Sequence, residues 1–239
     1  VNEKIDFEPQ FISTYYNDSG DRINSIGLYN AFFDNDKIYS AFYDEVSDNY
    51  VDLIKELDIN LILGPPGSGK TTTICSKIIE DIKIGRTVFV MCFTNRALDE
   101  IENRLNENNY FVENNFADVV YRFNRKERPI SKTNKVSSSQ FQVFLSTVHS
   151  TKTEIISKWK NEFDVCYIDE ASQLNFTMCA NGFLGKKNIL VGDYNQLSPL
   201  VPLDLIPKFN TDIVRKSFFE ILWNKISNTD ANNRCEYLS

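Results

Sequence analysis

The chain has 239 residues, with 33 acidic and 26 basic side chains and an isoelectric point near 4.9, so its overall charge gives no case for nucleic-acid binding. Its 42% hydrophobic and 25% charged residues are typical of a globular protein and exclude the disordered class. No apolar run approaches the roughly 20 residues of a membrane-spanning helix, and the amino-terminal residues do not resemble a signal peptide. We therefore expect a cytoplasmic or nuclear protein that is not secreted and has no membrane partner.

The five cysteines are scattered, none has C-x-x-C spacing, and the chain has a single histidine. This pattern predicts free, mostly buried thiols, with neither a disulfide framework nor a structural zinc site.

The amino-terminal part of the chain differs in charge from the rest. Residues 1–60 carry 13 acidic and 4 basic side chains, whereas residues 61–239 carry 20 acidic and 22 basic ones. Amphipathic spacing from about Ile26 to Leu57 predicts one or two helices. We interpret residues 1–57 as an acidic, helical extension that packs against other parts of the protein, and residues 58–239 as the main domain.

Short apolar runs alternate with helical patterns through the main domain. Strands are predicted at 61–63, 87–93, 119–121, 141–146, 165–168 and 188–191. Helices are predicted from the apolar stripes Ile74, Ile78 and Ile82; Leu98, Ile101 and Leu105; and, between about 212 and 225, Val214, Phe218, Ile221 and Leu222. Continuous apolar strands separated by helices indicate an α/β fold with a doubly wound, mainly parallel sheet.

Residues 122–139 form a polar insertion between two of these strands. It is rich in basic side chains, namely Arg122, Arg125, Lys126, Arg128, Lys132 and Lys135. This cluster either adds electrostatic grip on a nucleic-acid strand or is a solvated loop.

A phosphate-binding loop follows the first predicted strand. The nine residues are Gly64, Pro65, Pro66, Gly67, Ser68, Gly69, Lys70, Thr71 and Thr72, of which the first eight fit G-x-x-x-x-G-K-[ST]. Glycines let successive backbone N–H groups point at phosphate oxygens at the start of the following helix. Lys70 is expected to bind the β- and γ-phosphates of ATP, and Thr71 to ligate Mg²⁺. ATP and Mg²⁺ are therefore the expected cofactors of a P-loop NTPase.

Two adjacent carboxylates, Asp169 and Glu170, follow the apolar run Val165–Ile168. A strand delivers them to the edge where open α/β sheets bind ligands. We expect Asp169 to hold Mg²⁺ through water, and Glu170 to orient and deprotonate the attacking water.

Four strings carry a family resemblance. Asp169-Glu170-Ala171-Ser172-Gln173 resembles motif II of superfamily 1 helicases, in the branch that contains the nonsense-mediated-decay helicase. Gly192-Asp193-Tyr194-Asn195-Gln196-Leu197-Ser198-Pro199 is similar to motif III of that branch, and Thr94-Asn95-Arg96-Ala97-Leu98-Asp99 to motif Ia. Leu145-Ser146-Thr147 occupies the place of motif Ic. The resemblance implies a RecA-like fold and an ATP-hydrolysing helicase.

The resemblance also implies roles at the matching positions. Gln196 would sense the γ-phosphate and join Lys70, Asp169 and Glu170 as a catalytic residue. Thr94, Asn95, Ser146 and Thr147 would hold the backbone of single-stranded DNA or RNA, contacts that are blind to sequence. The expected polarity is 5′ to 3′. Simple β-propensity is an alternative explanation of Ser146 and Thr147.

The sequence departs from the family pattern in two respects. The glutamine that reads adenine upstream of the P-loop is missing, since no glutamine lies between Gln10 and Gln140. The sequence also ends near the expected position of motif IV, so we expect only the first RecA-like lobe, with the second lobe and its arginine finger as partners in a longer parent protein. On its own this lobe would hydrolyse ATP poorly.

Two other functions fit the same motifs. A switch or defence ATPase would use the P-loop without unwinding nucleic acid. A lobe without catalytic activity could serve as a module that binds ATP or a partner protein.

Overall fold

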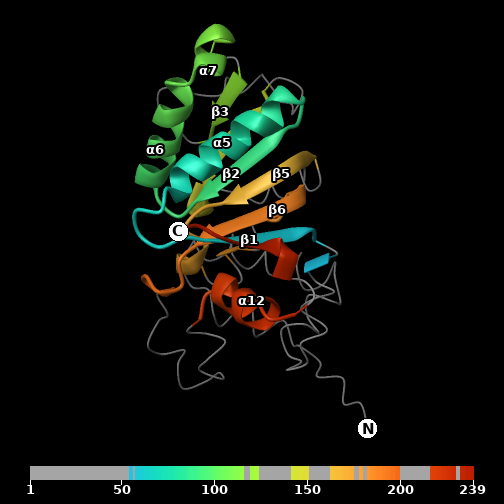
Figure 1. The fold of residues 1–239 in the computed structure, drawn as a ribbon. Helices are drawn as coiled ribbons and strands as arrows, with labels where there is room; N and C mark the ends of the chain where they lie inside the picture. The colour runs from blue at the N-terminus through green and yellow to red at the C-terminus, as the bar shows by residue number, and fades with distance from the viewer. Residues whose placement is uncertain are drawn as a thin grey trace, which may run out of the picture.

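A computed structural model describes residues 54–55, 57–115, 119–123, 141–150, 162–174, 178–179, 182–199, 216–229 and 232–239. Seven strands in these residues form one parallel sheet in the order β3-β4-β2-β5-β6-β1-β7 (Figure 1). Their bounds are β1 Ile59–Leu63, β2 Val88–Cys92, β3 Val120–Arg122, β4 Val143–Thr147, β5 Phe163–Ile168, β6 Gly185–Gly192 and β7 Cys235–Tyr237. The six predicted strands are confirmed, and the sheet is parallel throughout.

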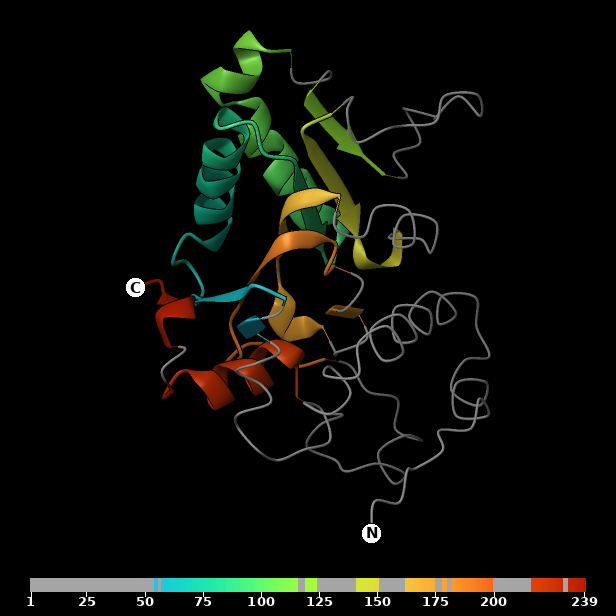
Figure 2. The same ribbon diagram turned by 90° about the vertical axis from the view of Figure 1, so that its right-hand side faces the viewer.

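Helices cover both faces of the sheet (Figures 1 and 2). On one face lie α5 (Lys70–Lys83), α6 (Asn95–Asn106) and the short α7 (Asn109–Glu113), and on the other lies α12 (Phe218–Ile226). This arrangement confirms the doubly wound α/β fold of a RecA-like P-loop domain. None of the described helices is long and apolar enough to cross a membrane.

Alternation along the strands divides the interior into two cores. Phe89 and Met91 of β2 lie in the core that α12 covers. Their neighbours Val88 and Val90 lie in the core beneath α5 and α6. Because side chains alternate across a strand, each of the strands β1 to β6 contributes to both cores. All five cysteines are free thiols, and four of them are buried, as the sequence predicts.

The strand β7 was missed by the sequence analysis. It pairs with β1, with Tyr237 opposite Leu63. It is held by the ion pair Arg234–Asp58 just before the strand and by the ion pair Lys77–Glu236 within it. A three-residue strand has too few positions to show an apolar alternation, and these tertiary contacts stabilise it.

The last predicted helix begins later than expected. Its first residue is Phe218, because the Ser217 side chain accepts a hydrogen bond of 3.0 Å from the Glu220 N–H and caps the helix. Residues 216 and 217 are therefore not helical, and Val214 lies outside the described residues.

Arg122 also requires a correction, because it is not part of a polar insertion. It is the last residue of β3 and is only 8% exposed. The other basic residues of the proposed insertion lie outside the described residues, as do residues 26–53 of the stretch predicted to be helical. Ile54 is fully buried in the core that α12 covers.

Candidate functional site

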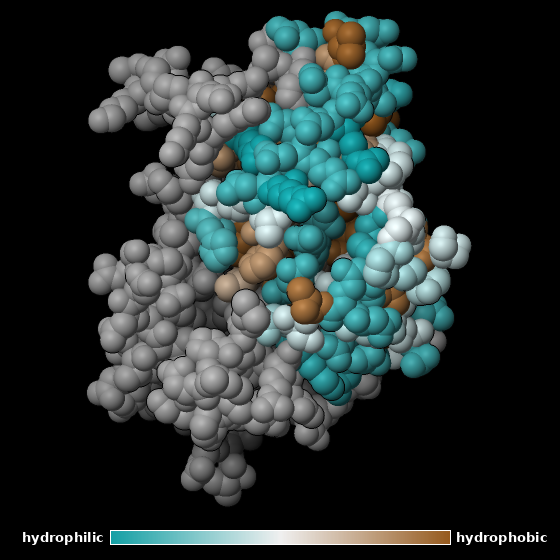
Figure 3. Space-filling model, turned by 90° about the vertical axis from the view of Figure 1, so that its left-hand side faces the viewer, coloured by the Kyte–Doolittle hydropathy of each residue, from teal (hydrophilic) through white to brown (hydrophobic). Residues whose placement is uncertain are grey.

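The predicted site residues gather along one edge of the sheet. All strands are parallel, so their carboxyl ends point the same way, to the left in Figure 1. The P-loop follows β1, Asp169 follows β5, and the loop that carries Gln196 follows β6. Figure 3 looks onto this edge, whose described surface is mainly hydrophilic with small hydrophobic areas. Open parallel sheets bind their ligands at such an edge.

The P-loop has the backbone that phosphate binding requires. Gly67 and Gly69 both have φ near 81°, in the left-handed region that favours glycine. A Cβ at Gly64 would fall 2.9 Å from Cγ of Lys70 and closer still to Oγ of Ser68, so the loop leaves no room for a side chain there. Lys70 opens α5, and its Nζ donates to the carbonyl oxygens of Gly64 at 2.6 Å and Pro65 at 3.2 Å. The lysine ammonium therefore lies over the P-loop, which is where a phosphate would bind.

The Asp169 carboxylate is buried at the end of β5. Its backbone N–H donates to Met91 at 2.8 Å, and its Oδ1 accepts the Glu170 N–H at 2.9 Å. Burial, at 5% exposure, raises the pKa of Asp169 to about 6. A carboxylate held away from water in this way gains by pairing with a cation.

Glu170 has an unusual backbone and an unsatisfied oxygen. Its φ of 55° lies in the left-handed region, which is uncommon for a residue with a side chain. Burial raises the pKa of this carboxyl group, and the charge of Lys70 opposes the rise. In the described part of the chain, Oε2 of Glu170 and Oγ of Ser68 are two of three buried side-chain oxygens without a hydrogen-bond partner. Such atoms at one edge indicate a site built to receive polar groups.

These residues fit ATP with Mg²⁺. Lys70 and the loop N–H groups suit phosphate oxygens, and a hydroxyl at Thr71 with a carboxylate at Asp169 suits Mg²⁺. The described residues contain no cluster of three or more His, Cys, Asp and Glu that could hold a metal. A magnesium ion here would therefore share its coordination with phosphate oxygens and water, as it usually does in NTPases.

A pair of hydrogen bonds ties the Asp169 loop to the Gln196 loop. Oγ of Ser172 accepts the backbone N–H of Asp193 at 3.2 Å. The Asp193 carboxylate in turn accepts from Nε2 of Gln196 at 2.9 Å. Gln196 is exposed, whereas Ser172 and Asp193 are buried. Both linking residues stand inside the motif strings, but their mutual contact could not be read from spacing.

Arg104 of α6 is a neighbour of the P-loop that the sequence analysis missed. Its Nη1 donates to Oγ1 of Thr72 at 3.0 Å, and its Nε and Nη2 donate to Glu100. Thr72 is exposed on the first turn of α5. This hydrogen bond joins the end of the P-loop to α6.

The four predicted nucleic-acid contacts lie at the same edge but differ in exposure. Thr94 and Asn95 are exposed where β2 ends, and Oγ1 of Thr94 caps α6 by accepting from Ala97 at 3.1 Å. Ser146 is fully buried and donates to the Thr147 carbonyl at 3.1 Å. Thr147, 5% exposed, donates through its hydroxyl to Ser150 at 2.9 Å. Contact between a nucleic-acid strand and any of these four side chains stays a prediction.

The fold and the site define a P-loop ATPase domain, and the comparisons place it in a family. The chain belongs to the AAA domain family, which matches residues 44–202. That match contains the P-loop, Asp169 and Glu170, and Gln196.

Curated relatives are DNA helicases. The chain is 34% identical over 157 residues to the DNA replication ATP-dependent helicase/nuclease DNA2 of Gallus gallus, covering 60% of this chain and 16% of that protein. It is 30% identical over 159 residues to the Saccharomyces cerevisiae protein of the same description, covering 62% of this chain and 10% of that protein. The chain thus spans less than a fifth of these relatives' length. It is an ATPase domain homologous to DNA helicases.

Solved structures are more distant. An arterivirus nonstructural protein 10 helicase in complex with DNA has 16% identity and a TM-score of 0.43, over 64% of this chain and 33% of that one. A Pif1 helicase structure described as unwinding forked DNA has 18% identity and a TM-score of 0.38, over 82% of this chain and 43% of that one.

Proposed function

We propose that this chain is the first ATP-binding lobe of a superfamily 1 motor that moves along single-stranded nucleic acid, with 5′-to-3′ polarity. DNA is the favoured substrate, because the curated relatives are described as DNA replication helicase/nucleases. The motor would act in the cytoplasm or nucleus and would include a second RecA-like lobe. The nonsense-mediated-decay-like branch of the superfamily is supported by the Asp169–Gln173 and Gly192–Pro199 strings.

One observation carries the proposal: the P-loop, the acidic pair of buried Asp169 and half-buried Glu170, and the Gln196 loop meet at one edge, and Ser172 links the last two. A binding module could keep a P-loop alone. An unsatisfied buried oxygen at Glu170, with its pKa raised by burial, is what a general base for water requires. This arrangement supports hydrolysis over simple nucleotide storage.

Each side chain has a separate task in this proposal. Lys70 would bind the β- and γ-phosphates, and Thr71 and Asp169 would hold Mg²⁺, which neutralises charge on the phosphates. Glu170 would orient the attacking water and accept its proton. Because Asp169 is buried, its charge would act through a medium with little water, where it has a greater effect.

Gln196 would report the loss of the γ-phosphate. Its amide already bonds to Asp193, which is held by Ser172 next to the acidic pair. A change at the phosphate would therefore move a loop that is exposed at Gln196 and Leu197, where Leu197 is 75% exposed. We propose that this loop faces the second lobe, so that hydrolysis releases one lobe from the other.

The test is MgATP turnover by the longest natural form of the protein, without polymer, with single-stranded DNA and with single-stranded RNA. A Lys70→Ala variant is the control. We expect strong stimulation by DNA that the variant loses. Turnover indifferent to both polymers would favour a switch ATPase, and ATP binding without turnover would favour a module without catalytic activity.

A further inference from the structure

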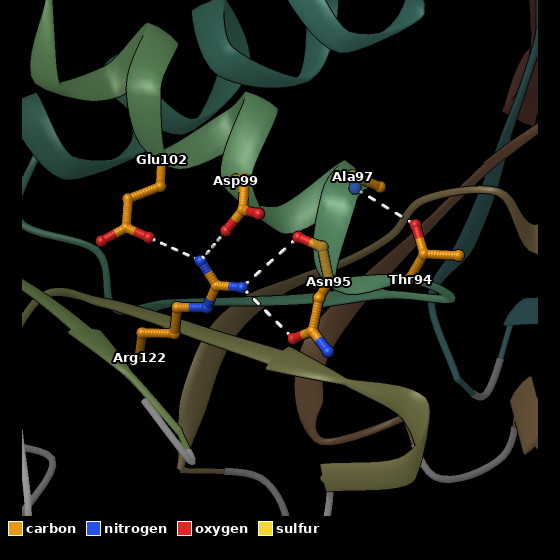
Figure 4. A network of polar contacts seen from close by, with 6 residues as sticks. All are labelled: Thr94, Asn95, Ala97, Asp99, Glu102 and Arg122. Carbon is orange, nitrogen blue, oxygen red and sulfur yellow. Dashed lines mark hydrogen bonds and ion pairs between the residues drawn. The ribbon is translucent and has the colours of Figure 1, made fainter. Parts of the chain in front are cut away.

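Arg122 holds a buried guanidinium against the start of α6 (Figure 4). Its Nη1 pairs with Asp99 and, at 2.7 Å, with Glu102. Its Nη2 donates to Asn95 twice, to the backbone oxygen and to Oδ1, both at 3.3 Å. One side chain of the edge strand β3 thus contacts three residues in the first two turns of α6.

The charge of Arg122 is not available to a nucleic acid. The guanidinium side chain is only 8% exposed, and two carboxylates already neutralise it. A phosphate that approached it would meet Asp99, whose side chain is 59% exposed. Any effect of Arg122 on a bound nucleic-acid strand must therefore pass through a neighbouring residue.

Asn95 is that neighbour, because its hydrogen bond with Arg122 fixes the orientation of its side-chain amide. A guanidinium has donors only, so the amide oxygen must face Arg122. The Asn95 nitrogen, with its two N–H donors, is then directed away from the guanidinium, as Figure 4 shows. An amide free to flip would offer an oxygen half of the time, and phosphate oxygens would repel it.

The position of Asn95 suits a ligand that accepts hydrogen bonds. The residue is exposed at the carboxyl end of β2, beside Thr94 and on the same edge as the P-loop. It also begins α6, where the helix dipole favours an anion. A phosphodiester group of a single strand meets both conditions.

We propose that Arg122 is a positioning residue: it locks the Asn95 amide so that its N–H groups face outward and donate to a phosphate oxygen of the bound strand. This inference rests on the proposed function, because it takes the strand to lie along this edge. It assigns to β3 and α6 a task that neither the P-loop nor the acidic pair performs.

The experiment measures the affinity of the full protein for labelled oligothymidylate by fluorescence anisotropy at fixed salt. The variants are Asn95→Ala, Asn95→Asp, Arg122→Met and the double variant Asn95→Ala with Arg122→Met. Asn103→Ala, the same deletion on an exposed residue at the far end of α6, is the matched control. Thermal unfolding of every variant is recorded alongside.

We expect Asn95→Ala to weaken binding about fivefold, which is the roughly 1 kcal/mol of one ordinary hydrogen bond. Arg122→Met should weaken it about twofold, because a freed amide still presents its N–H groups about half of the time. The double variant should bind no more weakly than Asn95→Ala alone, because Arg122 acts only through the Asn95 amide. Asn103→Ala should bind like the wild type. Multiplied losses in the double variant would overturn the inference, since a merely structural Arg122 would act independently of Asn95.

Asn95→Asp tests the same inference without touching Arg122, should Arg122→Met fail to fold. The carboxylate keeps an acceptor for the guanidinium and suits the helix start, so the fold should be at least as stable. It has no donor, so binding should weaken at least as much as in Asn95→Ala. Affinity equal to that of Asn103→Ala would overturn the inference and leave the proposed function standing, whereas a wild type that binds no strand would overturn both.

Discussion

The predicted nucleotide region and the predicted nucleic-acid region of this edge are built in opposite ways. Around the P-loop, oxygens of Ser68 and Glu170 are buried without partners, and Asp169 is a buried carboxylate. Around the predicted strand contacts, the hydroxyl groups are already used: Thr94 caps α6, and the Ser146 hydroxyl bonds to the Thr147 carbonyl.

This difference indicates how the two ligands would be bound. The residues of the predicted nucleotide site already lie together at this edge, and their unsatisfied groups favour a polar ligand. Among the four predicted contact residues, Asn95 has amide N–H groups that are directed away from Arg122. Tight binding of a strand should therefore require the second lobe, whereas binding of ATP should need mainly this one.

The largest expected effect concerns the acidic pair. Glu170→Gln should lower MgATP turnover of the full protein by about 10²- to 10⁴-fold, because it removes the base while keeping the shape. Glu113→Gln, an exposed change on α7, is the control and should have no effect. Turnover within a factor of two of the wild type would mean that Glu170 is not the general base.

Asp169→Asn should stabilise the metal-free chain by about 3 kcal/mol at neutral pH, because burial disfavours the charged form. Since the folded pKa is raised from 3.8 to about 6, the destabilisation by Asp169 is complete above pH 6 and fades as the pH falls toward 3.8. Chemical denaturation with a chelator present, at several pH values, measures the difference. A less stable variant at neutral pH would mean that the carboxylate is held by favourable bonds rather than strained by burial.

Ser172→Ala should cost about 1–2 kcal/mol in the free energy of unfolding, since it leaves the buried Asp193 N–H without its acceptor. It should also weaken the link between the two loops, so that turnover falls with little change in ATP affinity. Ser172→Thr, which keeps the hydroxyl, is the comparison. If Ser172→Ala unfolds with the same midpoint denaturant concentration as the wild type, the hydrogen bond between the two loops is not a stabilising contact.

The smallest expected effect belongs to Thr94. Thr94→Ala should destabilise the chain by about 1 kcal/mol through loss of the α6 cap, whereas Thr94→Asn should preserve the cap. Strand affinity measured on both variants separates the two roles. Weaker binding in Thr94→Asn at unchanged stability would indicate a direct contact by the threonine hydroxyl.

Strong local patterns in the sequence predicted most of the fold. Strands such as β2 and β5 are continuous apolar runs, and α5 and α6 carry clear apolar stripes, so periodicity identified them. The strand β7 and the five-residue α7 are too short to show any period. The helix α12 begins late because Ser217 caps it. Ser217 and Glu220 have the spacing of a capping box, but the prediction followed the apolar stripe and placed the start of the helix earlier.

The chemical site was predicted better than its supports. Lys70, Asp169 and Glu170 stand in motifs whose spacing reflects phosphate chemistry, and the structure brings all three to one edge. Arg122 looked like the first residue of a basic run, because its partners Asp99 and Glu102 lie about 20 residues earlier in the chain. Only tertiary packing distinguishes a buried ion pair from a solvated charge.

The central claim is that ATP binds to a site that this lobe forms by itself. Calorimetric titration of the chain with a slowly hydrolysed MgATP analogue tests it directly, with Lys70→Ala as the variant. We expect the wild type to bind and the variant to bind at least about tenfold more weakly, since a charged hydrogen bond to phosphate is lost. Equal affinity of the two proteins, or no binding by a folded wild type, would contradict the account.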